Sequence, residues 1–152
     1  MQAEKNKVQT SRFGEIEVDR DRIISMTSPF PGFPDSSRFL LLPSKPDSPF
    51  LWLQSMDDPE LAFVIIHAAL LDLDYTPPIP ASVQEELKIQ SEQDQEILTI
   101  LTIPQGKPRE MTANLLGPVI LNSSKRLAKQ IVLDPNKYDL CWPVFGEKQV
   151  AK

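Results

Sequence analysis

The stretch MTANLLGPVILNSSKRLAKQIVLD, residues 111–134, carries the pattern that decides the fold. Two apolar segments, NLLGPVILN and LAKQIVLD, are joined by the four-residue connector SSKR, which has the length of an ordinary β-hairpin loop. Gly117 and Pro118 lie inside the first segment and predict a bulge or an edge position, because proline donates no hydrogen bond to a neighbouring strand. We therefore expect two antiparallel strands, preceded by a short segment with the polar residues Thr112 and Asn114.

Further strand signals precede this stretch. Three apolar runs, at residues 38–43, 50–55 and 61–66, are separated by connectors rich in Pro, Asp and Ser, which predicts an antiparallel meander. The segment EILTILTIP, residues 96–104, is apolar or threonine in nearly every position. This predicts a strand that is buried on both faces or lines a closed barrel, and we expect it to pair with the stretch at 111–134.

The other local sequence signals favour many short helices and strands. The sequence EIEVD, residues 15–19, alternates polar and apolar side chains as a half-buried strand does. Ser82 followed by Glu85 forms a capping box and predicts one short helix. The chain has 15 Pro against 5 Gly, and proline is poorly tolerated in helices and central strands. We predict a mainly β fold, a small antiparallel barrel-like or strongly bent sheet with one or two short helices.

The length of 152 residues suits one domain with a sizeable core. We expect residues 1–11 to be a disordered leader, residues 12–145 to form the single β domain and residues 146–152 to be a flexible tail. The N-terminus has basic residues but no apolar segment behind them, and the longest apolar run is too short to cross a bilayer. With one cysteine and no disulfide framework, the sequence predicts a cytoplasmic protein that does not enter membranes.

Charge is distributed unevenly along the chain. Residues 46–100 carry eleven Asp or Glu against one Lys, a net charge of minus ten, whereas the two flanking segments are slightly basic. Two interpretations stay open: a solvated surface that confers solubility, and a docking face for a basic partner. In either case direct nucleic-acid binding is disfavoured, because neutralising phosphates requires basic side chains.

The sequence contains few residues or motifs that are typical of catalytic sites. None of the common serine-hydrolase or nucleotide-binding motifs occurs, His67 is the only histidine, and Cys141 is expected to be a buried, inert thiol. The acidic groups DDPE at residues 57–60 and DLD at residues 72–74 lack the ligand pattern of a calcium loop and indicate turns. We predict a protein that is not an enzyme and has no cofactor or metal site. The alternative is a small β-barrel enzyme or a carbohydrate-binding module that uses the acidic loops.

Several phrases together resemble one protein family. They are, in chain order, RFGEIEV, PGF, SPFLWLQSMDDPELAFVI, MTANLLGPVILN and AKQIVLD. Their order and spacing are similar to those of the flagellar assembly factor FliW family, and the resemblance covers nearly all of residues 12–142.

The resemblance implies a non-enzymatic regulator with a small β-barrel-like fold. We expect the chain to be a monomer when unbound. Members of this family bind flagellin in the cytoplasm and also bind CsrA, a dimeric repressor of flagellin translation. Free FliW sequesters CsrA from the flagellin mRNA, and abundant unsecreted flagellin occupies FliW. The chain is thus expected to be a partner-switching post-transcriptional regulator and flagellin chaperone.

The candidate partner-binding residues fall into two groups. The first group is the acidic turn with its apolar neighbour, namely Met56, Asp57, Asp58 and Glu60, which we expect near the surface that meets CsrA. The second group is Thr112 and Asn114. These two side chains have the chemistry either to hydrogen-bond exposed backbone where the chain enters a strand or to contact a partner directly.

Overall fold

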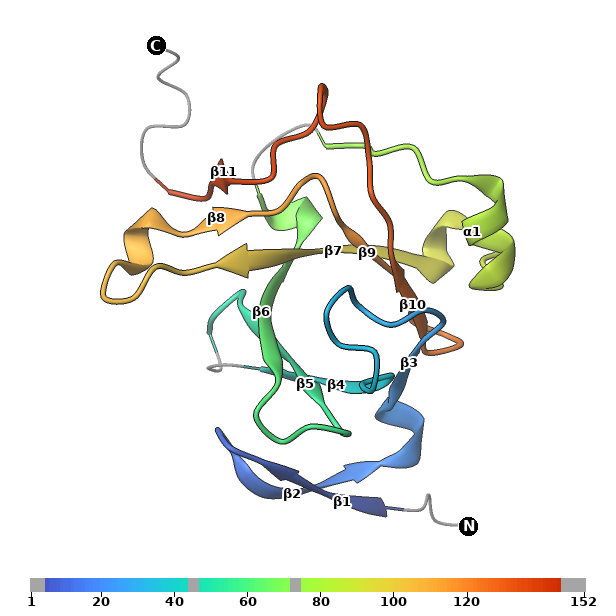
Figure 1. The fold of residues 1–152 in the computed structure, drawn as a ribbon. Coiled ribbons are helices and arrows are strands. Elements are labelled where there is room, and N and C mark those ends of the chain that lie inside the picture. Colours follow the sequence, from blue (N-terminus) through green and yellow to red (C-terminus); the bar gives the residue numbers. More distant parts are fainter. Residues whose placement is uncertain (1–4, 44–46, 72–74, 146–152) are drawn as a thin grey trace.

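The computed structural model describes residues 5–43, 47–71 and 75–145 (Figure 1). The strands are β1 (Lys5–Thr10), β2 (Gly14–Asp19), β3 (Ile24–Met26), β4 (Arg38–Pro43), β5 (Leu51–Ser55), β6 (Ala62–His67), β7 (Gln95–Thr102), β8 (Thr112–Ala113), β9 (Val119–Asn122), β10 (Leu127–Gln130) and β11 (Trp142–Pro143). The helical elements are α1 (Ala81–Glu86) and the 3-10 turns η1 (Arg20–Arg22), η2 (Ala68–Leu70), η3 (Glu92–Asp94) and η4 (Pro108–Glu110).

A ring of strands closes into a barrel (Figure 1). The order of neighbours is β7, β6, β5, β4, β3, β10 and β9, and the ring closes because β7 pairs with β6 along one edge and with β9 along the other. All of these pairings are antiparallel except that of β3 with β10, which is parallel. Closure removes the exposed edges that an open sheet would present. The predicted mainly β, barrel-like fold is confirmed.

The predicted meander forms one wall of the barrel. In β4 and β5 Phe39 lies opposite Ser55, and in β5 and β6 Leu53 lies opposite Phe63. Alternate side chains along each strand point inward, so Phe39, Leu53 and Ile65 are almost completely buried. Each such side chain contributes roughly 1.5–3 kcal/mol of hydrophobic stabilisation. The spacing of apolar runs in the sequence therefore gave the correct strands and the correct neighbours.

Strand β7 belongs to the barrel and to a lateral extension. Its first half pairs with β9 and its second half pairs with β8, which in turn pairs with β11. The extension has its own apolar cluster, in which Ile66, Leu101, Met111 and Leu115 are buried. The predicted pairing of residues 96–104 with the stretch at 111–134 is confirmed.

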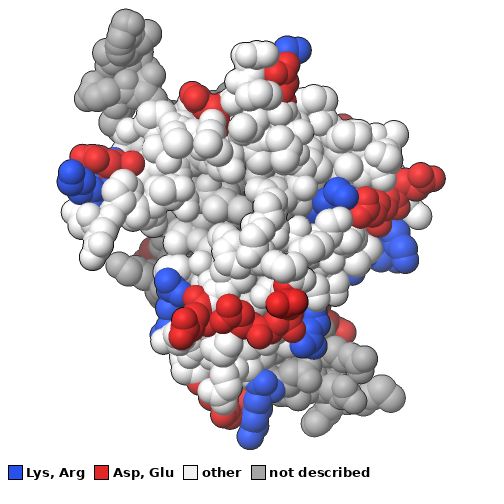
Figure 2. Space-filling view, viewed as in Figure 1, with Lys and Arg blue, Asp and Glu red and all other residues white. Residues whose placement is uncertain are grey.

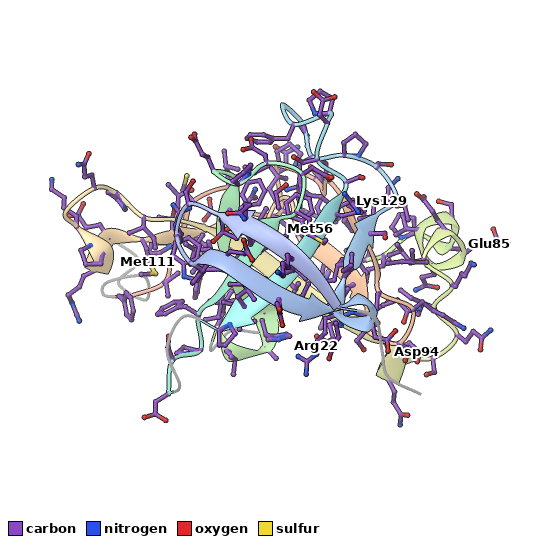
Figure 3. The ribbon with its side chains drawn as sticks, turned by 90° about the horizontal axis from the view of Figure 1, so that it is seen from below. Arg22, Met56, Glu85, Asp94, Met111 and Lys129 are labelled. Carbon is purple, nitrogen blue, oxygen red and sulfur yellow. The ribbon has the colours of Figure 1, made fainter. Side chains whose placement is uncertain are left out.

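A separate two-stranded sheet, β1 with β2, lies across the lower end of the barrel (Figures 1 and 3). Val8 of β1 is buried, at 3% exposure. The Arg12 guanidinium lies 4.4 Å from the centre of the Trp52 ring, and the amide of Ser11 donates to the carbonyl of Pro59 over 2.9 Å. These contacts attach the β1–β2 hairpin to the barrel.

The expectation of a disordered leader over residues 1–11 is wrong for residues 5–10, which form β1. The physical reason is the complementary edge that β2 offers, together with the burial of Val8 and Thr10. Neither contribution is visible in residues 1–11 alone, because the partner strand follows them in the chain. Residues 1–4 and the predicted tail at 146–152 lie outside the described residues.

The predicted helix is present as α1, but its cap differs from the prediction. Pro80 occupies the N-cap position and no side chain caps the helix, so Ser82 lies within the first turn. Val83 and Leu87 are buried as the spacing predicts, and they pack with Ile120 and Ile131 of the barrel wall. Packing of this apolar face therefore holds the helix, without a capping box.

Asn122, at the end of β9, connects α1 to the barrel. Its side-chain amide donates to the carbonyls of Leu87, over 2.8 Å, and Lys88, over 3.1 Å. Its side-chain oxygen accepts hydrogen bonds from the amides of Ser124 and Lys125 in the β9–β10 turn. With 1% exposure, Asn122 is a buried polar group whose hydrogen-bonding capacity is satisfied.

The predicted hairpin at residues 111–134 is confirmed for β9 and β10, which are antiparallel and joined by residues 123–126. The strand does not include Gly117 and Pro118, contrary to the prediction of a bulge or edge position within it; both precede β9, in a turn closed by Asn114. Cys141 is exposed, so the expectation of a buried thiol is also wrong. Among the described residues, no helix is long and apolar enough to span a membrane.

Candidate partner-binding surface

The turn between β5 and β6 contains the first group of predicted site residues. The Asp57 carboxylate is held by three donors: the amides of Ser37, at 2.9 Å, and Arg38, at 3.1 Å, and the Arg38 guanidinium, at 2.9 Å. The amide of Asp57 itself donates to the hydroxyl of Ser55 over 3.0 Å. Asp57 therefore fastens the β5–β6 turn to the start of β4.

The electrostatics of Asp57 agree with this role. Burial raises the pKa of the carboxyl group, but the hydrogen bonds from the Arg38 guanidinium and from the two amides outweigh burial. The pKa consequently lies below its usual value of 3.8, and the group is charged at neutral pH. Its charge is largely compensated by Arg38, so Asp57 has little capacity left for a partner.

Asp58 and Glu60 differ from Asp57. All three residues are exposed, but within the described residues neither the Asp58 nor the Glu60 carboxylate takes part in an ion pair. One oxygen of Asp58 accepts the amide of Glu60 at 3.0 Å, and the amide of Asp58 donates to the hydroxyl of Ser55. The turn thus presents two uncompensated negative charges on a backbone that local hydrogen bonds fix.

The loop at residues 29–36 lies beside this turn. Together they line an open cleft of about 370 Å³, with Phe33 and Asp35 on one side and Asp57 and Asp58 on the other. Phe33 keeps 38% of its surface exposed, and Ser36 bonds through its hydroxyl to Ser55. Figure 2 shows a band of acidic side chains low on this face, where Figure 1 places the β5–β6 turn, with basic side chains beside it.

Met56 is half-buried, and its amide donates to the carbonyl of Arg38 over 2.8 Å. It is therefore less available to a partner than Asp58 or Glu60, which follow it in the turn. In the view from below in Figure 3, Met56 lies near the centre of the molecule and Met111 lies well to one side.

Thr112 and Asn114 do not join the acidic turn. Thr112 lies in β8, opposite Thr102 of β7 and Pro143 of β11. Asn114 accepts the amides of Leu116, at 3.0 Å, and Gly117, at 2.8 Å, through its side-chain oxygen. Of the two roles considered for Asn114, backbone hydrogen bonding is therefore the one found. Figures 1 and 3 separate β8 from the β5–β6 turn, so the two predicted groups do not form one site.

Arg38, the partner of Asp57, is a site residue that the sequence pattern did not predict. A signal was present, because a meander that places Phe39 opposite Ser55 brings Arg38 close to residues 56 and 57. Composition alone identified the acidic residues of the turn. Which of them pairs with a basic side chain depends on the register of β4 against β5. No group of three or more His, Cys, Asp or Glu suited to a metal ion occurs in the part of the chain that the structure describes.

Comparisons with known proteins agree with this architecture. The model of the family described as FliW protein matches residues 7–144. The flagellar assembly factor FliW of Magnetococcus marinus is 42% identical over 130 residues, covering 83% of this chain and 78% of the relative. That of Moorella thermoacetica is 36% identical over 141 residues, covering 93% and 89%.

A solved structure shows the same fold. The crystal structure of a flagellar assembly factor FliW superposes with a TM-score of 0.85 at 34% sequence identity, covering 94% of this chain and 99% of the other. The match therefore extends over the barrel, the lateral extension and the acidic turn. On the family model, the identity to these relatives and the shared fold, the chain belongs to the FliW family of flagellar assembly factors.

Proposed function

We propose that this chain is a partner-switching regulator of flagellin synthesis. It binds flagellin in the cytoplasm and, when free of flagellin, binds the translational repressor CsrA and prevents its repression of flagellin mRNA. Membership of the FliW family supports the proposal. The chain acts by binding, as a monomer when unbound, without catalysis, a cofactor, a membrane or direct contact with nucleic acid.

The CsrA part of the proposal rests on the different roles of the three acidic residues in the turn. Asp57 is compensated by Arg38 and holds the turn in place, whereas Asp58 and Glu60, which are also exposed, have no ion-pair partner among the described residues. A repressor that grips RNA must present basic side chains, and fixed acidic groups attract such a surface while repelling phosphate. The acidic turn is the part of the proposed CsrA-binding surface that excludes RNA.

The proposal is tested by calorimetric titration of the purified protein with CsrA, at low and at moderate salt. We expect binding that weakens as salt rises, because the exposed charges are screened within about 10 Å at 0.1 M salt. The titration is repeated with flagellin already bound, and flagellin is expected to abolish the CsrA signal. If the protein binds flagellin but not CsrA, the CsrA part of the proposal is wrong. The protein would then be a flagellin chaperone, and the acidic turn would serve only solubility.

The contribution of the turn is isolated by the double variant Asp58→Lys with Glu60→Lys. It should weaken CsrA binding at least tenfold and flatten its salt dependence, because two attractive charges become repulsive. The matched control is Glu92→Lys, which changes an exposed acid of η3, away from the turn. Asp57 is left intact, since its replacement would also release the turn. Equal affinities of the double variant, the control and the unaltered protein would refute this assignment.

A further inference from the structure

The loop PFPGFPDS, residues 29–36, displays an aromatic side chain at the cleft beside the acidic turn. The amide of Phe33 donates to the carbonyl of Phe30 over 3.0 Å, which closes a turn with Pro31 and Gly32 in its middle. Gly32 has a φ of +89°, and a proline followed by a glycine of positive φ is what a type II turn favours. The sequence of this turn therefore fixes the backbone that leads to Phe33.

A second turn follows directly. The amide of Ser36 donates to the carbonyl of Phe33 over 3.2 Å, with Pro34 and Asp35 between them. Ser36 is buried, at 4% exposure, and its hydroxyl accepts a hydrogen bond from that of Ser55 over 3.2 Å. Phe33 thus lies at the junction of two turns that are anchored to β5, with the exposed Asp35 close behind it in the chain.

The Phe33 ring is the outer end of a series of packed aromatic rings. It makes an edge contact with Phe63, at 5.7 Å between ring centres. Phe63 packs against Phe30 at 4.8 Å, and Phe30 packs against Phe39 at 5.5 Å. Phe39 is completely buried in the barrel core, whereas Phe33 keeps 38% of its surface exposed. The exposed ring is therefore held from below, and it needs little reorganisation to meet a partner.

The uncompensated charge of this cleft has a single sign. Residues 32–36 and 57–59 line it, and no Lys, Arg or His is among these residues. The Asp57 carboxylate is paired with Arg38. Asp35 and Asp58, by contrast, form no ion pair with any residue that the structure describes. An exposed aromatic ring and two unpaired carboxylates therefore share one cleft of about 370 Å³.

This combination selects a guanidinium group. A guanidinium stacks on an aromatic face and donates from its rim to carboxylates, and both interactions use the same plane. The Arg12 guanidinium over the Trp52 ring, at 4.4 Å, shows such stacking elsewhere in the molecule. A lysine ammonium has no plane to stack, and an apolar side chain would desolvate the carboxylates without pairing them.

We propose that the cleft between residues 32–36 and 57–59 receives an arginine side chain of CsrA. Its guanidinium lies against the Phe33 ring and donates to the carboxylates of Asp35 and Asp58. This inference rests on the proposed function and deepens it, because it names the chemical group that meets the acidic turn. Phe33 and Asp35 thereby extend the partner surface beyond the β5–β6 turn.

The contribution of each side chain is tested by titrating variants with CsrA and, in parallel, with flagellin. Phe33→Leu keeps an apolar side chain but removes the aromatic face, and it should weaken CsrA binding about five- to tenfold. Phe33→Tyr keeps the face and should retain affinity within about twofold. Asp35→Asn should weaken CsrA binding about threefold or more, whereas Glu92→Gln, at an exposed acid of η3, should not. Melting temperatures check that each variant is folded.

The identity of the partner group is tested on CsrA itself. Phenylglyoxal modifies accessible arginines, and mass spectrometry then identifies the CsrA arginines that a complex protects. We expect one arginine to be protected by the unaltered protein and to be modified faster when CsrA is saturated with Phe33→Leu instead. If no arginine differs between the two complexes, the cleft does not hold an arginine.

Failure of the cleft and failure of the proposed function give different results. If the unaltered protein binds CsrA, and Phe33→Leu and Asp35→Asn bind it equally well, the cleft assignment is wrong and the proposed function stands. If Phe33→Leu weakens flagellin binding and leaves CsrA binding unchanged, the assignment to CsrA is also wrong. If the unaltered protein does not bind CsrA, the CsrA part of the proposed function fails, and the arginine assignment fails with it.

Discussion

Asp57 illustrates, at the scale of single residues, how a side chain that looks like a contact residue is committed to the fold. Asp57→Asn should destabilise the protein by about 1–2 kcal/mol at pH 7, because one carboxylate oxygen that accepts hydrogen bonds is replaced by an amide donor. Urea unfolding monitored by fluorescence measures the difference. Asp35→Asn, at a neighbouring exposed acid, should be nearly neutral.

The same residue predicts a pH dependence. The pKa of Asp57 is lowered in the folded protein, so its stabilising contribution is fully present above its usual value of 3.8 and is lost as pH falls through the lower, folded value. The stability gap between the unaltered protein and Asp57→Asn should therefore shrink on acidification below pH 3.8. A gap of constant size from neutral to strongly acidic pH would contradict the role assigned to the carboxylate.

Asn114 gives a second prediction at this scale. Asn114→Ala leaves the amides of Leu116 and Gly117 without their acceptor and should cost about 1–2 kcal/mol, a decrease of several degrees in melting temperature. Asn114→Asp keeps an acceptor oxygen and should recover much of the stability. If Asn114→Ala instead weakened binding of flagellin or CsrA while its melting temperature stayed the same, a direct partner contact would be the correct interpretation.

At the scale of elements, Asn122 joins α1 to the barrel and to the β9–β10 turn. Asn122→Ala should be destabilising by about 3 kcal/mol, because two buried carbonyls and two amides lose their partner at once. Chemical denaturation measures this loss, with Asn136→Ala in an exposed turn as the control. A loss no greater than that of the control would show that water replaces these bonds without cost.

At the start of α1, by contrast, we expect a substitution to leave the stability almost unchanged. Ser82 lies inside the first turn and forms no cap, so Ser82→Ala should change the free energy of unfolding by no more than about 0.5 kcal/mol. Thermal melts of the two proteins test this. A loss of about 1 kcal/mol, which is typical of a removed cap, would show instead that Ser82 caps the helix as the sequence predicts.

At the scale of the whole molecule, the two tryptophans lie on different parts of the architecture. Trp52 faces the β1–β2 hairpin at one end of the barrel, and Trp142 lies in β11 of the lateral extension. Because β7 is shared by barrel and extension, we expect a single cooperative transition. In each of Trp52→Phe and Trp142→Phe, urea midpoints from tryptophan fluorescence and from far-ultraviolet circular dichroism should coincide. A separate early transition in the Trp52→Phe protein, where Trp142 reports, would show that the extension unfolds on its own.

The sequence by itself determined the strands of the meander, the β9–β10 hairpin, the short helix and the acidic character of the β5–β6 turn. These features depend on apolar periodicity, turn composition and local charge, all of which are properties of neighbours in the chain. The family could also be recognised from local phrases, since their order and spacing are specific.

The tertiary structure alone decided which of these residues are available to a partner. The register of β4 against β5 compensates Asp57 with Arg38, and it leaves Asp58 and Glu60 without an ion-pair partner among residues 5–43, 47–71 and 75–145. The edge offered by β2 orders residues 5–10. Each of these outcomes depends on pairing between segments distant in the chain, and local sequence specifies the preference of a segment for a strand more strongly than the partner that it meets.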